Sequence, residues 1–179
     1  MNLSTMNHME VHLNRSFCEP EPEGNTVTIT FQQDVWVPPP SVPQEPTRVI
    51  IADPNPFMRE GVAKICQTVG LQVLSQCAEG STALESIRSL RPDFALLEVY
   101  MPKLGGTQVV RKVRESECPT RCIILTGIPD ESTIRESFEA GADGYLLKLY
   151  FHAGILCDAI SYIRGGGRYI SYSGTWHEK

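Results

Sequence analysis

From residue 48 onward, short apolar runs alternate with longer segments in which apolar positions recur every three or four residues. Runs of the first kind are typical of buried strands, and segments of the second kind are typical of amphipathic helices. We therefore predict five strands, at 49–52, 71–75, 94–97, 122–125 and 144–147. A helix is expected after each strand, at 56–69, 81–90, 106–115, 130–140 and 152–164.

Residues that start and stop helices agree with this alternation. Pro56 suits a first helical turn, and Ser81 is expected to cap the second helix. Gly70 and Gly141 are expected to end the first and fourth helices. Strands that alternate with helices imply a parallel sheet covered on both faces. The predicted fold class is α/β, a doubly wound five-stranded parallel sheet with the flavodoxin-like strand order 2-1-3-4-5.

The flanks of this segment differ from it in composition. Prolines concentrate in residues 1–47, which we expect to be a largely disordered N-terminal extension. Within it, 26–31 alternates apolar and polar residues, and a hairpin with 35–37 is the alternative. Residues 168–179 are expected to be a C-terminal linker or tail. This leaves 48–167 as one domain of ordinary size.

Charge and hydropathy limit the class of partner. The 179 residues carry a formal net charge of -5. A chain that grips nucleic acid presents a basic face to the phosphates, so this charge argues against direct nucleic-acid binding. No apolar run approaches the ~20 residues that span a bilayer, and the N-terminus lacks the basic and apolar regions of a secretion signal. We therefore expect a cytoplasmic protein with no membrane partner.

Six cysteines are spread along the chain. Four have apolar neighbours and are expected to be small core residues: Cys66, Cys77, Cys122 and Cys157. Cys118 and Cys122 flank a short loop, so a redox pair or half of a metal site is the alternative for these two.

Polar residues stand at the ends of four predicted strands. Asp53 follows the first strand, Glu98 the third, Thr126 ends the fourth and Lys148 follows the fifth. The carboxyl ends of parallel strands meet at one edge of a sheet, which is where open α/β folds place their sites. We therefore expect these four side chains to share one crevice.

Three segments resemble bacterial receiver domains, the phosphorylation-controlled part of response regulators. They are RPDFALLEVYMPKLGG at 91–106, GADGYLLK at 141–148 and PFMREG at 56–61. The likeness is closest to receivers of the NarL/FixJ type and spans about 48–167. It implies a (βα)5 receiver fold.

The resemblance also implies a chemistry for the crevice. In such receivers an aspartate at the third strand end accepts a phosphoryl group, and two adjacent acids at the first strand end hold Mg²⁺. A Thr or Ser hydroxyl and a Lys bind the phosphoryl oxygens, and an aromatic residue of the fifth strand follows the hydroxyl inward. Partners or a second copy then dock on the face of the fourth helix and fifth strand.

Three residues of this chain match the pattern at the phosphate. Thr126, Lys148 and the aromatic Tyr145 are the equivalents of the hydroxyl, the cation and the switch residue. The phosphoacceptor position, however, holds Glu98. Its longer side chain is expected to reach Lys148 as a fixed ion pair, and its charge is a partial mimic of a phosphorylated aspartate.

The acid pair that holds the metal is also reduced. Asp53 is followed by Pro54, which removes the principal carboxylate ligand. Magnesium binding, through Asp53 and Glu98, is therefore expected to be weak if it occurs at all. No other cofactor is expected.

These departures favour an atypical, phosphorylation-independent receiver that acts through protein–protein interaction or dimerisation to control a transcriptional output. The face of the fourth helix and fifth strand is the expected partner surface. Three alternatives stay open: a conventional Mg²⁺-dependent phosphoacceptor, a receiver gated by a small molecule in the crevice, and an inert relic of a salt-bridge cluster.

An enzyme is not expected, because the chain shows no pair of nucleophile and base and no phosphate-binding glycine loop. Receivers of the NarL/FixJ type continue into a DNA-binding helix-turn-helix domain, whereas this chain stops at Lys179. It is either a natural single-domain protein or a fragment of a longer regulator. DNA binding is expected only through a C-terminal domain absent from this chain.

Overall fold

The computed structural model describes residues 45–171. The expectations for 1–44, including the hairpin at 26–37, and for 172–179 lie outside the described residues. The strands of the described part are β1 (Arg48–Ala52), β2 (Gln72–Cys77), β3 (Phe94–Leu97), β4 (Arg121–Thr126), β5 (Gly144–Leu147) and β6 (Tyr169–Ser171). Its helices are α1 (Pro56–Thr68), α2 (Gly80–Leu90), α3 (Gly106–Glu115), α4 (Glu131–Glu139), the short 3-10 helix η2 (Lys148–Tyr150) and α5 (Ala153–Arg164).

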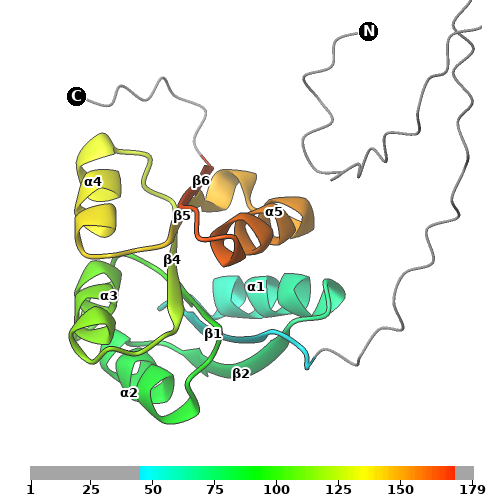
Figure 1. The fold of residues 1–179 in the computed structure, drawn as a ribbon, viewed down its shortest axis with the longest axis horizontal. Coiled ribbons are helices and arrows are strands. Elements are labelled where there is room, and N and C mark those ends of the chain that lie inside the picture. The colour runs from blue at the N-terminus through cyan, green and yellow to red at the C-terminus, as the bar shows by residue number, and fades with distance from the viewer. Residues whose placement is uncertain (1–44, 172–179) are drawn as a thin grey trace, which may run out of the picture. The chain divides into compact units, whose positions relative to one another are not determined.

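The sheet is parallel throughout and has the strand order β2-β1-β3-β4-β5-β6 (Figure 1). The first five strands follow the predicted order, so the doubly wound α/β fold class is confirmed. β6 is an addition, pairing from Tyr169 with Gly144 to Ser171 with Leu146. The fold therefore continues past residue 167, into the segment expected to be a linker. Three residues after a glycine run give too short an apolar pattern to be distinguished from a linker.

Helices cover both faces of the sheet (Figure 1). α1 and α5 pack on one face, against a cluster that includes Ile51 and Leu146. α2, α3 and α4 pack on the other face, against a cluster that includes Ile50 and Tyr145. Successive residues of one strand point to opposite faces, so a central strand contributes to both clusters and is apolar throughout. Among the helices of the described part, none is long and apolar enough to cross a membrane.

The start of α1 follows its local sequence. The Asn55 side chain caps the helix by accepting hydrogen bonds from the backbone N–H groups of Phe57 and Met58. Pro56 occupies the first turn, as predicted. The cap residue thus lies two positions after Asp53, and its own N–H donates to the Asp53 carboxylate.

The start of α2 is set by a tertiary contact instead. The helix begins at Gly80, so the prediction of Ser81 as its cap is wrong. The Gly80 N–H donates to the carbonyl of Pro102 at 3.2 Å, and a Cβ at this position would lie 1.8 Å from the carbonyl oxygen of Leu104. Glycine therefore allows α2 to touch the loop after β3, a contact that local sequence does not reveal.

Arg114, near the end of α3, binds three acceptors in two loops at the amino edge of the sheet, the loop before β4 and the loop before β5. Its Nε donates to the carbonyl of Gly141 at 2.9 Å, and its Nη1 donates to the carbonyl of Thr120 at 2.9 Å. Its Nη2 forms an ion pair with Asp143 Oδ2 at 2.5 Å. The same carboxylate oxygen accepts from the Cys122 N–H at 2.6 Å. Asp143 thus ties β4 and β5 to α3, in addition to its place in a turn.

Candidate functional site

Asp53 lies at the carboxyl end of β1 and is 4% exposed. Its backbone N–H donates to the carbonyl of Cys77 in β2 at 3.0 Å. Its Oδ1 accepts from the Asn55 N–H at 2.8 Å, and Arg59 of α1 donates to its carbonyl oxygen at 2.6 Å. Sheet, cap and first helix together hold the carboxylate at the edge of the sheet.

Glu98 occupies the equivalent position at the end of β3, where its backbone N–H donates to the carbonyl of Ala52 at 2.8 Å. Its Oε1 accepts from the Val99 N–H at 2.6 Å and from the Tyr100 N–H at 3.4 Å. The Thr126 hydroxyl donates to the same oxygen at 2.5 Å. The glutamate carboxylate is therefore fixed by its own loop and by the neighbouring strand end.

The turn after Glu98 requires a close backbone approach. The Gly106 N–H donates to the carbonyl of Val99 at 2.8 Å. A Cβ at Gly106 would lie 2.3 Å from the carbonyl oxygen of Glu98. Glycine at the first position of α3 therefore lets the helix start directly against the acid-bearing loop.

Lys148, the first residue of η2, bridges the two acids. Its Nζ lies 2.5 Å from Asp53 Oδ2 and 2.5 Å from Glu98 Oε2. Burial lowers the pKa of Lys148, but the hydrogen bonds to Asp53 and Glu98 and their negative charges outweigh burial and raise it above its ordinary value. The lysine stays charged. The expected ion pair between Glu98 and Lys148 is thus present, and Asp53 shares it.

Thr126 and Tyr145 are both fully buried but make different contacts. Thr126 donates to Glu98, whereas the Tyr145 hydroxyl donates to the carbonyl of Ile128 at 2.6 Å. Burial raises the pKa of Tyr145, with further contributions from the charges of Asp130 and Glu98. Tyr145 therefore stays protonated and ties β5 to the loop after β4. The other four predicted residues are joined to one another in a cluster, whereas the hydroxyl of Tyr145 binds outside it.

The oxygen atoms of this cluster do not fit a Mg²⁺ ion. Magnesium requires near-octahedral oxygen ligands. Both carboxylate oxygens of Asp53 and both of Glu98 already accept hydrogen bonds, and two of the four face the ammonium group of Lys148. Pro54 is exposed and has no ligand atom in its side chain. Across residues 45–171, no group of three or more His, Cys, Asp or Glu side chains is placed to hold a metal ion.

Two contributors to the site are absent from the predicted set. The order Asp53-Pro54-Asn55-Pro56 contains a cap residue before a first-turn proline, and this signal identifies Asn55. Arg59 has no such signal. It reaches the carbonyl of Asp53 only because α1 turns it back over the end of β1.

The structure differs in one respect from the partner face predicted on the fourth helix and fifth strand. All four residues of β5 are buried, and β6 covers its outer edge. The surface next to α4 therefore comes from β6 and the residue before it, where the Arg168 guanidinium lies 5.9 Å from the ring centroid of Phe138. The solvent side of α4 is charged, with Glu131, Arg135 and Glu139 exposed.

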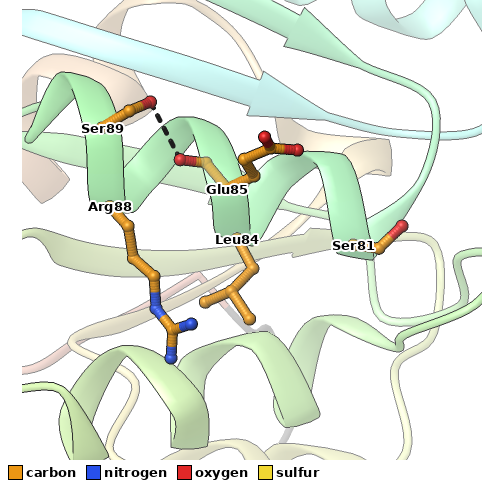
Figure 2. Close-up of a pocket in the computed structure, with 5 residues that line it drawn as sticks. All are labelled: Ser81, Leu84, Glu85, Arg88 and Ser89. Carbon is orange, nitrogen blue, oxygen red and sulfur yellow. Dashed lines mark hydrogen bonds between the residues drawn. The ribbon is translucent and has the colours of Figure 1, made fainter.

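A shallow hollow of 410 Å³ along α2 is separate from this cluster. Figure 2 shows the residues that line it, all from α2: Ser81, Leu84, Glu85, Arg88 and Ser89. The Ser89 hydroxyl donates to the backbone carbonyl of Glu85 at 2.9 Å, a contact within the helix. The polar groups are spread along the helix, so we assign no chemistry to this hollow.

The response regulator receiver domain family matches residues 49–161, which is more than half of the chain. The chain belongs to this family. The match covers β1 from its second residue, all of β2 to β5, and all four residues of the cluster.

Relatives of known name include "Probable transcriptional regulatory protein NarL" of Mycobacterium tuberculosis, which is 37% identical over 105 residues. That alignment covers 58% of this chain and 49% of the relative. Response regulator GacA of Pseudomonas viridiflava is 32% identical over 127 residues, covering 69% of this chain and 58% of the relative. The chain spans about half the length of the curated relatives it matches.

Solved structures agree with the family. The signal receiver domain of NarL from Mycobacterium tuberculosis has a TM-score of 0.65 and 32% identity, covering 68% of this chain and 99% of that chain. A two-component response regulator of the LuxR family from Aurantimonas sp. SI85-9A1 has a TM-score of 0.66 and 28% identity, covering 71% of this chain and 91% of that chain. The receiver fold predicted from sequence is confirmed.

Proposed function

We propose that this chain is an atypical receiver that phosphorylation does not switch and that signals through protein–protein contacts. The bridge from Lys148 to Asp53 and Glu98 is the observation that carries the proposal. Phosphoryl transfer to a receiver needs a free carboxylate as acceptor and a metal ion to neutralise charge. Here both carboxylates are engaged by an ammonium group instead.

Displacing that ammonium group is energetically demanding. Removing one partner of a buried ion pair typically costs about 3–5 kcal/mol, because the other charge is left uncompensated. The side chains of Asp53 and Glu98 are only 6% and 11% exposed, so water compensates little. Pro54 supplies no second carboxylate to recruit a metal ion that would offset the loss.

The contacts around Glu98 also support a domain held in one state. The Thr126 hydroxyl is already drawn onto the Glu98 carboxylate, and Tyr145 is fully buried. In receivers of this family the hydroxyl and the aromatic residue move inward on phosphorylation. The fixed charge of Glu98 therefore takes the place of a phosphorylated aspartate, with one negative charge and without the phosphoryl oxygens.

The output we propose is transcriptional control in the cytoplasm. A relative carries the name of a transcriptional regulatory protein, and this name supports a transcriptional output. The receiver would contribute a contact to a protein partner or a second copy through α4 and β6.

A pair of charge reversals tests this face. Arg135→Glu is expected to weaken self-association in sedimentation experiments, whereas Arg88→Glu on α2 is expected to leave it unchanged. Equal effects of the two variants would argue against this face.

A second candidate is a receiver gated by a small molecule. A hollow of 560 Å³ adjoins the cluster, lined by the loop after β3 and by α3 and α4, with Val99, Tyr100 and Glu136 among its residues. Small-molecule sites commonly have volumes of about 300–1,000 Å³. A metabolite that binds here would raise the melting temperature of the native chain, and Gln108→Trp would abolish the increase. A screen of fractionated cell extracts by thermal shift tests this.

Exposure to acetyl phosphate and Mg²⁺, read by intact mass, tests the principal proposal. The native chain is expected to gain no phosphate. A variant with Glu98→Asp and Pro54→Asp is expected to gain one phosphoryl group, and Glu98→Asp alone separates the two substitutions. A phosphorylated native chain would mean that the domain is a working phosphoacceptor switch.

A further inference from the structure

An apolar groove lies beside the cluster, between the segment before α5 and the strand β6. Its volume is 710 Å³, and Leu149, Phe151 and Ile155 form much of its wall. Leu149 is 82% exposed, which makes it one of the most exposed large apolar side chains of the described residues. A single exposed leucine is ordinary. A leucine at the mouth of an apolar groove belongs to a continuous apolar surface, and burial of that surface by another segment would be favourable.

The outer edge of β6 adjoins the same groove. Within the described residues β6 pairs only with β5, so its other edge presents unpaired N–H and C=O groups. Edge strands of natural proteins are commonly covered or paired. Ser171 is both the last described residue and part of the groove lining, so the chain leaves β6 at the groove itself.

We propose that residues 172–179 turn back along β6 as an antiparallel strand and place Trp176 in this groove. The sequence after Ser171 is YSGTWHEK, and its Ser-Gly dipeptide is a turn signal. A two-residue turn at 173–174 sets Ser171 opposite Trp176. The chain that follows β6 thus contains both the turn and the large apolar side chain that the groove requires.

Strand alternation decides which face Trp176 occupies. Cross-strand partners share a face of the sheet, and residues two apart in one strand share a face as well. In the proposed register Trp176 would share a face with Ser171 and Tyr169, and Tyr169 packs with the cluster under α1 and α5. This is the face to which Ile155 of α5 belongs. The proposed register would therefore bring the indole to the side of the sheet on which Ile155 and Tyr169 line the groove.

The energetics favour this occupant over a free partner. A buried tryptophan removes a large apolar area from water, and the short connection keeps the segment at a high effective concentration. A turn of few residues also carries a small loop-closure entropy. The edge of β6 gains backbone hydrogen bonds in the same step.

Docking of this segment would couple the cluster to the chain that leaves the domain. Leu149 directly follows Lys148, and both belong to η2. We therefore expect a change at the ion pair to be felt at Leu149, in one wall of the groove. This coupling goes beyond the proposed function and does not require that the domain be insensitive to phosphorylation.

Tryptophan fluorescence of the full chain tests the proposal. The chain has two tryptophans, Trp36 and Trp176, so Trp36→Phe leaves the second as the sole reporter. We expect blue-shifted emission and an acrylamide quenching constant several-fold below that of a free peptide of residues 168–179. Leu149→Asp in the same background should shift the emission to the red and raise quenching to the peptide value. Phe57→Asp, at a side chain that is 84% exposed and outside the groove, should change neither quantity.

Thermal unfolding of each variant verifies that the fold is intact. Peptide-like emission from Trp36→Phe would overturn the proposal. Burial that appears only as the protein concentration rises would also overturn it, because the groove would then take a second copy. Unchanged emission after Leu149→Asp would show that Trp176 is buried elsewhere.

Discussion

Lys148 and Glu98, fifty residues apart in the sequence, meet at the carboxyl edge of the sheet with Nζ and Oε2 2.5 Å apart. The same ammonium group binds Asp53. One side-chain cation thus compensates two buried carboxylates, and the Thr126 hydroxyl and backbone N–H groups satisfy their remaining oxygens. The charge balance of the crevice is set by the chain itself.

Lys148→Met is expected to lower the free energy of unfolding by about 3 kcal/mol. The substitution leaves two buried carboxylates side by side without a cation. Urea denaturation monitored by circular dichroism measures the change.

Arg135→Met provides the matched control for this loss. Its ion pair with Glu131 joins side chains that are 64% and 63% exposed, so its removal should change the free energy of unfolding by less than about 0.5 kcal/mol. If Lys148→Met and Arg135→Met lowered the free energy of unfolding equally, the bridge at Lys148 would contribute no more than a surface pair.

Thr126→Val is expected to destabilise the fold by about 1.5–3 kcal/mol, because a hydrogen bond to a charged oxygen is lost at a fully buried site. Valine keeps the shape of the side chain. Thr68→Val removes a hydroxyl that bonds a helix carbonyl at an exposed position, and it should have little effect. If Thr126→Val lowered the free energy of unfolding as little as Thr68→Val does, the hydrogen bond from this hydroxyl to Glu98 would be contradicted.

The contribution of Lys148 should depend on alkaline pH. Folding raises its pKa above the ordinary value of about 10.4. A raised pKa gives stability that is fully present below the unfolded pKa and is lost as the pH rises through the folded pKa. The stability difference between the native chain and Lys148→Met should therefore be constant from neutral pH to about 10 and shrink above it. A difference that grows above that pH would contradict the raised pKa.

Arg114→Lys is expected to lower the free energy of unfolding by about 1–3 kcal/mol, since an ammonium group cannot reach three acceptors in the geometry of the guanidinium fork. Arg111→Lys on the same helix changes an exposed residue and should be nearly neutral. Chemical denaturation of the two variants in parallel compares the losses, and a neutral Arg114→Lys would show that the clamp adds nothing.

Much of the fold is predictable because central parallel strands are buried on both faces. β3 and β5 read as four-residue apolar runs and agree with the prediction residue for residue, as does α3. β2 was predicted at 71–75 but spans Gln72–Cys77, because this strand lies next to only one neighbour and is partly exposed. β6 escaped prediction because its pairing partner, and not its own sequence, makes it a strand.

The part of the site that follows from sheet topology could be predicted. Parallel strands bring Asp53, Glu98 and Lys148 to one edge whatever lies between them. The sharing of one ammonium group by both acids was not predictable, because it depends on the reach of Lys148 across two strands. Arg114 was missed for the same reason, since its partner Asp143 lies 29 residues away.

Calorimetric titration with Mg²⁺ tests the central claim most directly. If Lys148 occupies the carboxylates of Asp53 and Glu98, the native chain should give no saturable heat, whereas the variant with Glu98→Asp and Pro54→Asp should bind the ion. Saturable binding by the native chain, as tight as by the variant, would contradict the claim that the ammonium group has replaced the metal ion.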